Sequence, residues 1–225
     1  TAGGLYHGWA KGAHLYSMKT LDSGAISPSA STSSFDLIRL WHRNKPVDPE
    51  TGFKRPTVVN ASWGSLFGMG QSNTAWNLNY RGTNYTNQTV GSNIYGFVGR
   101  YRSDFGQFVH PYSNPIYETE IEDMLDEGVH FVTSAGNYQS YIAAIEDQDY
   151  NNQTTSPYSY FYHRGGLGGT LSNAITVGNI NNNNGGGGAG ATEETKASSS
   201  ECGPGVTIWA AGTNIISAGF QEASF

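Results

Sequence analysis

The sequence has 225 residues, the size of a single domain that can bury a hydrophobic core of its own. Its 12 basic and 18 acidic residues give a formal net charge of −6, and only 13% of residues are charged, which argues against a nucleic-acid-binding protein. No apolar run is long enough for a transmembrane helix. The single cysteine, Cys202, excludes an internal disulfide and a cysteine-based zinc site.

Two helices are expected from apolar periodicity and from end signals. The first begins at Ser34, a favoured N-cap residue, and runs to about Arg43 with its apolar residues on one face. The second begins at Asn114 followed by Pro115, a pair typical of a helix start, and ends at Gly128.

Strands are expected around these helices, which indicates an α/β fold with right-handed crossovers. Uncharged runs rich in β-branched residues, such as residues 57–62, are typical of strands buried on both faces of a parallel sheet. The predicted strands are residues 13–19, 57–62, 129–134, 174–179, 206–210 and 214–217. We expect the first four to be neighbours in one parallel sheet, with the helices at 34–43 and 114–127 packed on its faces.

Two long segments lack apolar periodicity and are predicted to be loop insertions. They cover about residues 65–113 and 138–170, and they are rich in glycine, asparagine and aromatic residues. Loops of this length are uncommon in compact domains and are usually functional or partly disordered. A third stretch, residues 181–190, is of low complexity and lacks the lysine of a phosphate-binding loop, so it is interpreted as a linker.

Motifs for several other enzyme classes are absent. The histidines lack the His-Glu-x-x-His spacing of a helical zinc site, and no Gly-x-Ser-x-Gly motif of an α/β-hydrolase occurs. His130 lies inside an apolar run, which predicts a hydrogen-bonded histidine in the core.

Several segments resemble, in order and spacing, the subtilisin-like serine proteases (subtilases). Residues 60–64 resemble that family's Asn-x-Ser-x-Gly strand end, and residues 128–137 look like its next strand, which ends in Ala-Gly-Asn. Three further segments are similar to family segments in the same order, namely residues 1–19, 173–179 and 197–217. In the last of these, Ala211 replaces the usual proline.

The resemblance implies a three-layer α/β sandwich with a mostly parallel central sheet. It implies one subtilase-like domain over residues 1–225, incomplete at both ends, from a serine endopeptidase with a Ser-His-Asp triad. The family's histidine motif would lie before Thr1 and its nucleophile motif after Phe225, so this chain alone is expected to be inactive. Asp22-Ser23-Gly24 mimics the aspartate motif but follows a different strand, and it is interpreted as a turn.

The resemblance assigns one catalytic residue and two substrate-binding segments within the chain. Asn137 corresponds to the subtilase asparagine whose side chain donates to the oxyanion of the tetrahedral intermediate. The walls of the primary specificity pocket would be Ser62, Trp63 and Gly64 on one side and Ser134, Ala135 and Gly136 on the other, paired with an extended peptide. Trp63 is bulkier than the family's common leucine, and core packing and an aromatic platform for the next subsite both fit it.

Two other functions stay open from the sequence. One is a catalytically inactive subtilase-like module for binding or assembly, and the other, disfavoured by the missing phosphate loop, is a doubly wound nucleotide-binding protein. The protease mechanism requires no cofactor, and a structural calcium ion is compatible with the family but has no support in the sequence, which contains no EF-hand loop. The expected partner is a protein or peptide substrate, without nucleic acid or membrane, and the resemblance favours a secreted or extracellular location. The sequence leaves the oligomeric state open.

Overall fold

The structure is a computed structural model that describes residues 8–22, 25–26, 28–70, 76–88, 100–102, 107–156, 158–168, 171–181, 194–213 and 215. The predicted linker at 181–190 and the strand predicted at 214–217 lie almost entirely outside these described residues.

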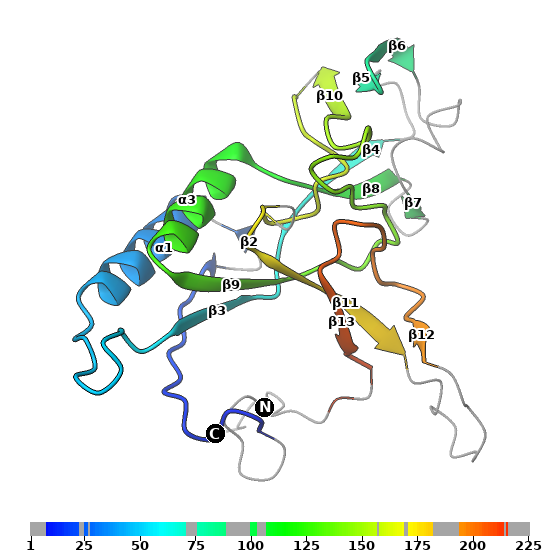
Figure 1. The fold of residues 1–225 in the computed structure, drawn as a ribbon. Helices are drawn as coiled ribbons and strands as arrows, with labels where there is room; N and C mark the ends of the chain where they lie inside the picture. The colour runs from blue at the N-terminus through cyan, green and yellow to red at the C-terminus, as the bar shows by residue number, and fades with distance from the viewer. Residues whose placement is uncertain are drawn as a thin grey trace, which may run out of the picture.

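A mostly parallel sheet forms the centre of the fold (Figure 1). Strands β3 (Thr57–Ala61), β9 (Val129–Ser134) and β11 (Ile175–Asn181) are parallel neighbours in that order. Strand β13 (Ile208–Ala211) is also parallel to β11, whereas the short β12 (Thr195–Lys196) pairs with it antiparallel. The predicted parallel arrangement of the strands at 57–62, 129–134 and 174–179 is therefore confirmed.

The strand predicted at residues 13–19 is wrong. That segment has no regular structure, and the first described strands are β1 (Leu21–Asp22) and β2 (Ala25–Ile26), which pair antiparallel. Ser23 and Gly24 of the turn predicted at residues 22–24 lie outside the described residues. Leu15 and Tyr16 are each 67% exposed, and no described strand pairs with their backbone. A segment with alternating apolar residues becomes a strand only where a neighbouring strand takes up its hydrogen bonds.

The second predicted helix is confirmed as α3 (Pro115–Asp126). The Oδ1 atom of Asn114 accepts a hydrogen bond from the backbone N–H of Ile116 at 3.0 Å, which caps the first turn. Gly128 follows the helix with a φ of +86°, a conformation that glycine adopts without strain and that turns the chain into β9.

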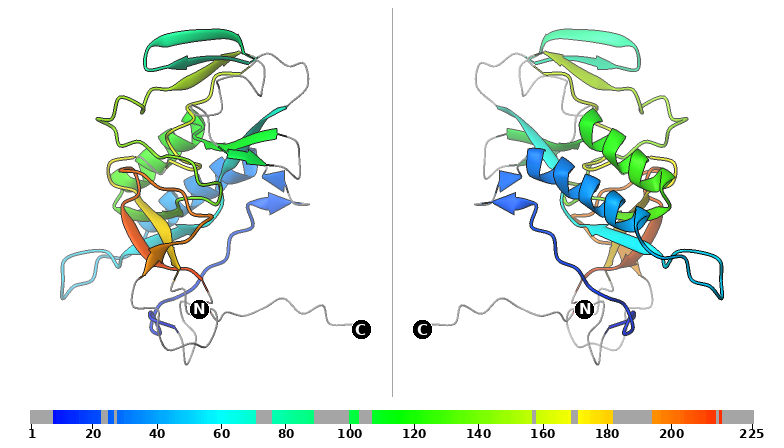
Figure 2. Two further views of the ribbon diagram at one scale, coloured as in Figure 1. Left: turned by 90° about the vertical axis from the view of Figure 1, so that its right-hand side faces the viewer. Right: turned by 90° about the vertical axis from the view of Figure 1, so that its left-hand side faces the viewer.

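The first predicted helix is longer at its start than expected. It forms α1 (Pro28–Arg43), because Pro28 supplies a helical φ in the first turn and so begins the helix before Ser34. Helices α1 and α3 lie side by side in Figures 1 and 2. Two ion pairs join them, Arg39 with Asp123 and Arg43 with Glu127.

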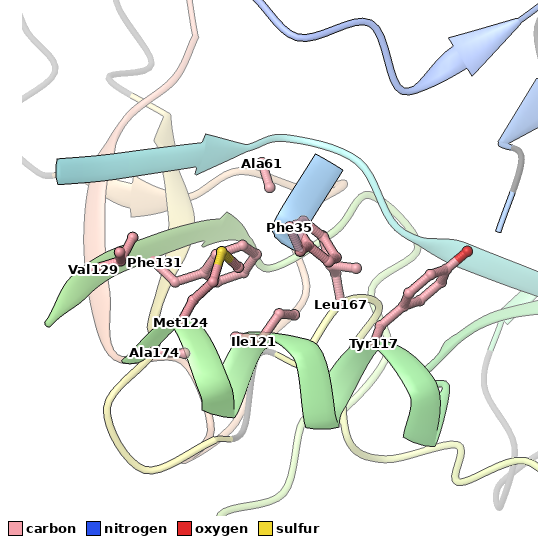
Figure 3. Packing of buried hydrophobic residues seen from close by; sticks show 9 residues of the cluster. All are labelled: Phe35, Ala61, Tyr117, Ile121, Met124, Val129, Phe131, Leu167 and Ala174. Carbon is pink, nitrogen blue, oxygen red and sulfur yellow. The ribbon is translucent and has the colours of Figure 1, made fainter. Parts of the chain in front are cut away.

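The main core lies between these helices and one face of the sheet (Figure 3). Its buried residues are Phe35, Ala61, Tyr117, Ile121, Met124, Val129, Phe131, Leu167 and Ala174. The rings of Phe35 on α1 and Phe131 on β9 meet edge to face with centroids 6.2 Å apart. Both helices therefore cover the face of β9 that carries Phe131.

The opposite face of the sheet is open in the described part of the chain. Along β9, Phe131 and Thr133 are buried, but His130 and Ser134 are exposed, and Val58 on β3 is 63% exposed. The expectations of strands buried on both faces and of a core histidine at 130 are wrong, because α1 and α3 lie on the same face. The described residues make two of the three expected layers.

The segment predicted as a loop at 65–113 contains strands instead. Strands β4 (Ser65–Gly70), β8 (Gln107–Tyr112) and β7 (Arg100–Arg102) form one antiparallel sheet. Strands β5 (Trp76–Tyr80) and β6 (Thr83–Gln88) form a hairpin. The hairpin pairs with β10 (Gln153–Ser156) from the second predicted loop, so both predictions of structureless loops are wrong in these parts.

The hairpin turn explains why its strands escaped the sequence pattern. Arg81 and Gly82 occupy the turn with φ values of +49° and +81°, and positive angles at both positions are what a type I′ hairpin turn requires. Asparagine or aspartate usually stands where Arg81 does, so the common turn signal is missing. Strand β5 alternates apolar and polar residues, but β6 is polar at every position except Tyr85, so the sequence shows no pair of alternating strands. In the described residues no helix is long and apolar enough to cross a membrane.

Candidate active site

The two segments expected to bind substrate leave the sheet next to each other. Strands β3 and β9 are parallel, with Asn60 opposite Val132 and Ala61 opposite Thr133. The side chain of Thr133 donates a hydrogen bond to the carbonyl of Ala61 at 3.1 Å, which holds the two strand ends in register. Since parallel strands end at the same edge of a sheet, residues 62–64 and 134–137 emerge together.

The polar side chains at these two ends are accessible. Ser62, Ser134 and Asn137 are exposed, whereas Ala135 is only 2% exposed and packs with Ile142 and Val206. Ala135 can therefore contribute its backbone to a ligand, but its methyl group belongs to the core. Its N–H already donates to the carbonyl of Val177 at 2.9 Å.

A third segment, around Gly166, packs against the end formed by residues 62–64. The backbone N–H of Ser65 donates to the carbonyl of Gly166 at 3.0 Å. A Cβ atom built on Gly64 would lie 2.9 Å from that same carbonyl oxygen, so a side chain at 64 would push the two backbones apart. Residues around Gly166 come from the segment predicted as the 138–170 loop, and they border the Ser62–Gly64 end.

Trp63 points into the aromatic part of the core. Its ring is stacked on Phe35 at a centroid distance of 6.2 Å and meets Tyr117 edge to face at 5.9 Å. Trp63 is half-buried against the main cluster. The sequence left two interpretations of Trp63, core packing and an aromatic platform for a substrate subsite, and these contacts favour core packing.

The segment that carries Asn137 is held by a run of backbone hydrogen bonds to residues 199–205. Gln139 N–H donates to Ser199 at 3.2 Å, and Cys202 N–H donates to Ser140 at 3.1 Å. Ile142 N–H then donates to the carbonyl of Cys202 at 2.7 Å. Asn137 is therefore an exposed side chain on a firmly anchored stretch of backbone.

A buried carboxyl lies behind this segment. Glu201 is 0% exposed, and its Oε1 accepts a hydrogen bond from the backbone N–H of Tyr138 at 2.9 Å. Burial raises the pKa of Glu201 to about 8, although the N–H groups of Tyr138 and Ser140 and the charge of Lys196 act in the opposite direction. The carboxyl is thus neutral at neutral pH.

No cluster of three or more histidine, cysteine, aspartate or glutamate side chains that could hold a metal ion occurs within the described ranges.

The sequence as a whole matches a known family. The model of the subtilase family, peptidase family S8, matches residues 1–224. This chain belongs to the subtilase family. Its relatives are serine proteases, hydrolases that act on proteins or peptides. No curated protein matches this subtilase.

The strand ends predicted as substrate walls do lie together in this subtilase, on the parallel neighbours β3 and β9. Two contributors to the site were not predicted. Gly166 lacks a side chain and stands in an aperiodic segment, so nothing in the sequence marks it. Glu201 could have been noticed, because it is the one charged residue in the run 197–213 of small and apolar residues.

Proposed function

We propose that this subtilase is the core of a serine endopeptidase in which Asn137 stabilises the oxyanion and the two strand ends bind the substrate backbone. Residues 62–64 and 134–136 would pair with an extended peptide by backbone hydrogen bonds, as a strand added to a sheet edge. A triad serine would attack the peptide carbonyl, a histidine would take its proton, and an aspartate would orient the histidine. The 225 residues contain neither the family's histidine motif nor its nucleophile motif, and Asp22-Ser23-Gly24 is interpreted as a turn, so the proposal applies to a protein that carries this chain together with a complete triad.

One observation carries the proposal. Asn137 is exposed directly after β9, beside the end of β3, on a backbone anchored to residues 199–205. Negative charge develops on the carbonyl oxygen during attack, and a fixed amide N–H stabilises that charge without adding a charge of its own. Fixed donors are effective because they need no rearrangement when the charge appears.

The test is Asn137→Ala in an active form of the protein. Loss of one oxyanion donor, for which a subtilisin asparagine is the known example, is expected to lower kcat by about 10²–10³ with little change in KM. The control is Asn44→Ala, which removes an exposed asparagine after α1 whose side chain donates to the carbonyl of Leu40 at the helix end. Unchanged kcat for Asn137→Ala would reject the oxyanion role.

The inactive-module alternative predicts a different result. A serine-directed fluorophosphonate should label a protein that contains this chain and the nucleophile motif, and it should leave the isolated 225-residue chain unlabelled. Absence of labelling in the longer protein, with the fold intact by circular dichroism, would favour a binding or assembly role.

A further inference from the structure

Glu201 is a buried carboxyl that the proposed mechanism does not use. Its side chain is 0% exposed and one oxygen is bonded to the N–H of Tyr138. Among the described residues the other oxygen, Oε2, makes no hydrogen bond of good geometry, although Ser140 lies close enough to lower the pKa of the carboxyl. Burying a carboxyl without satisfying both oxygens lowers stability. A stabilising role for the fold alone would be better served by an apolar residue of similar size.

Glu201 contacts the residue on each side of Asn137. Its backbone N–H donates to the carbonyl of Gly136 at 3.3 Å, and its Oε1 accepts from the N–H of Tyr138 at 2.9 Å. The side chain also packs on Gly136, where a built Cβ atom would lie 2.8 Å from Glu201 Cγ. The φ of +118° at Gly136 turns the backbone around the carboxyl.

We propose that Glu201 is a positioning residue, which fixes the backbone on both sides of Asn137 and so holds the asparagine side chain where the oxyanion forms. The inference rests on the proposed function, because the position of Asn137 matters for turnover only if it binds the oxyanion. Displacing a donor by about 1 Å can lower a rate by about 10². A carboxyl that holds the flanking backbone would therefore affect kcat through Asn137.

A neutral Glu201 carboxyl is compatible with the negative charge that would develop on the substrate beside Asn137. A carboxylate charge behind the loop would oppose the negative charge that develops on the substrate, whereas a neutral carboxyl accepts the Tyr138 hydrogen bond without that repulsion. Burial keeps the carboxyl neutral at neutral pH by raising its pKa.

The effect of the Glu201 side chain on this backbone can be separated from the effect of the backbone hydrogen bonds that also anchor it. The backbone hydrogen bonds of Gln139, Ser140 and Ile142 to residues 199–202 do not involve the Glu201 side chain. We therefore expect them to survive when that side chain is changed, so that the fold is retained while the backbone at 136–138 loosens.

The experiment compares three substitutions of Glu201 in a triad-containing, active form of the protein. Glu201→Gln keeps an oxygen for the Tyr138 N–H, and kcat is expected to stay within about threefold of the parent. Glu201→Ala removes the contact, and Glu201→Asp shortens the side chain by one methylene so that the carboxyl no longer reaches. Both are expected to lower kcat by about 10- to 100-fold with KM nearly unchanged. Glu122→Gln, at an exposed position on α3, is the matched control and should have no effect.

Hydrogen exchange of residues 136–140 in the 225-residue chain supplies a readout that needs no activity. Faster exchange there in Glu201→Ala, but not in Glu201→Gln, is expected if the carboxyl holds this backbone. The inference is overturned if exchange and kcat are unchanged in Glu201→Ala, or if Gln and Asp variants have equal kcat. If exchange rises while Asn137→Ala leaves kcat unchanged, the proposed function fails and the inference about Asn137 fails with it. If Glu201→Ala does not fold, the kcat of Glu201→Gln compared with that of Glu201→Asp decides whether the inference holds.

Discussion

Arg81 and Asp149 form a bidentate ion pair across two segments that are 68 residues apart in the sequence. The Nε and Nη2 atoms of Arg81 each donate to one carboxylate oxygen of Asp149 at 2.7 Å. Asp149 is 7% exposed and also accepts from Asn152 at 2.8 Å, and the hydrogen bonds to Arg81 lower the pKa of its carboxyl. The pair fastens the β5–β6 hairpin to the segment around β10.

Replacing Arg81 by alanine should therefore loosen this attachment. Among the described residues, the change leaves the buried Asp149 carboxylate with the hydrogen bond from Asn152 alone, and we expect the free energy of unfolding to fall by about 2 kcal/mol. Urea unfolding followed by fluorescence measures this free energy of unfolding. Arg55→Ala, at an exposed site before β3, is the control, and an equal loss in both variants would contradict the special role of the pair.

Trp63→Ala distinguishes packing from substrate binding at this position. Because the ring contacts both Phe35 and Tyr117, its removal should lower the free energy of unfolding by about 3 kcal/mol. Trp63→Phe should recover most of that loss. A rise in KM without loss of stability, measured in an active form, would instead assign Trp63 to a substrate subsite.

Gly136→Ala should lower the free energy of unfolding more than a glycine-to-alanine change at a position with open space around it. The added methyl would meet Glu201 Cγ at 2.8 Å, and the φ of +118° is unfavourable for alanine, so a loss of about 3 kcal/mol is expected. Gly52 is the matched control, with a φ of +74° but nothing within 4 Å of a built Cβ. Gly52→Ala should cost about 1 kcal/mol. Equal losses in thermal or urea unfolding would show that Glu201 does not crowd Gly136.

The raised pKa of Glu201 makes stability depend on pH. The carboxyl titrates near 4.5 when unfolded and at about 8 when folded, so between these values the folded state binds one more proton than the unfolded state. Its stabilising contribution is complete below pH 4.5 and is lost as the pH rises to about 8, with a slope of about 1.4 kcal/mol per pH unit. Glu201→Gln should remove that slope from urea unfolding measured between pH 5 and 8. An identical slope in the Gln variant would show that another group titrates.

Local signals in the sequence determined the main elements of the fold. The Asn114-Pro115 pair predicts the start of α3 through a cap that involves only neighbouring residues. Runs such as residues 57–62 predict strands because their β-branched side chains favour extended backbone over a few positions. The order of the segments also identifies the subtilase family, and the match over residues 1–224 confirms it.

Only the tertiary structure decided which faces are covered and which groups are buried. Residues 13–19 have a strand-like pattern but no strand beside them, and His130 is exposed because α1 and α3 lie on the other face of β9. The β5 strand pairs with β10, more than 70 residues later, and Glu201 is buried against Gly136, 65 residues earlier. Such pairings depend on the free energy gained when distant segments meet, and no short stretch of sequence contains that information.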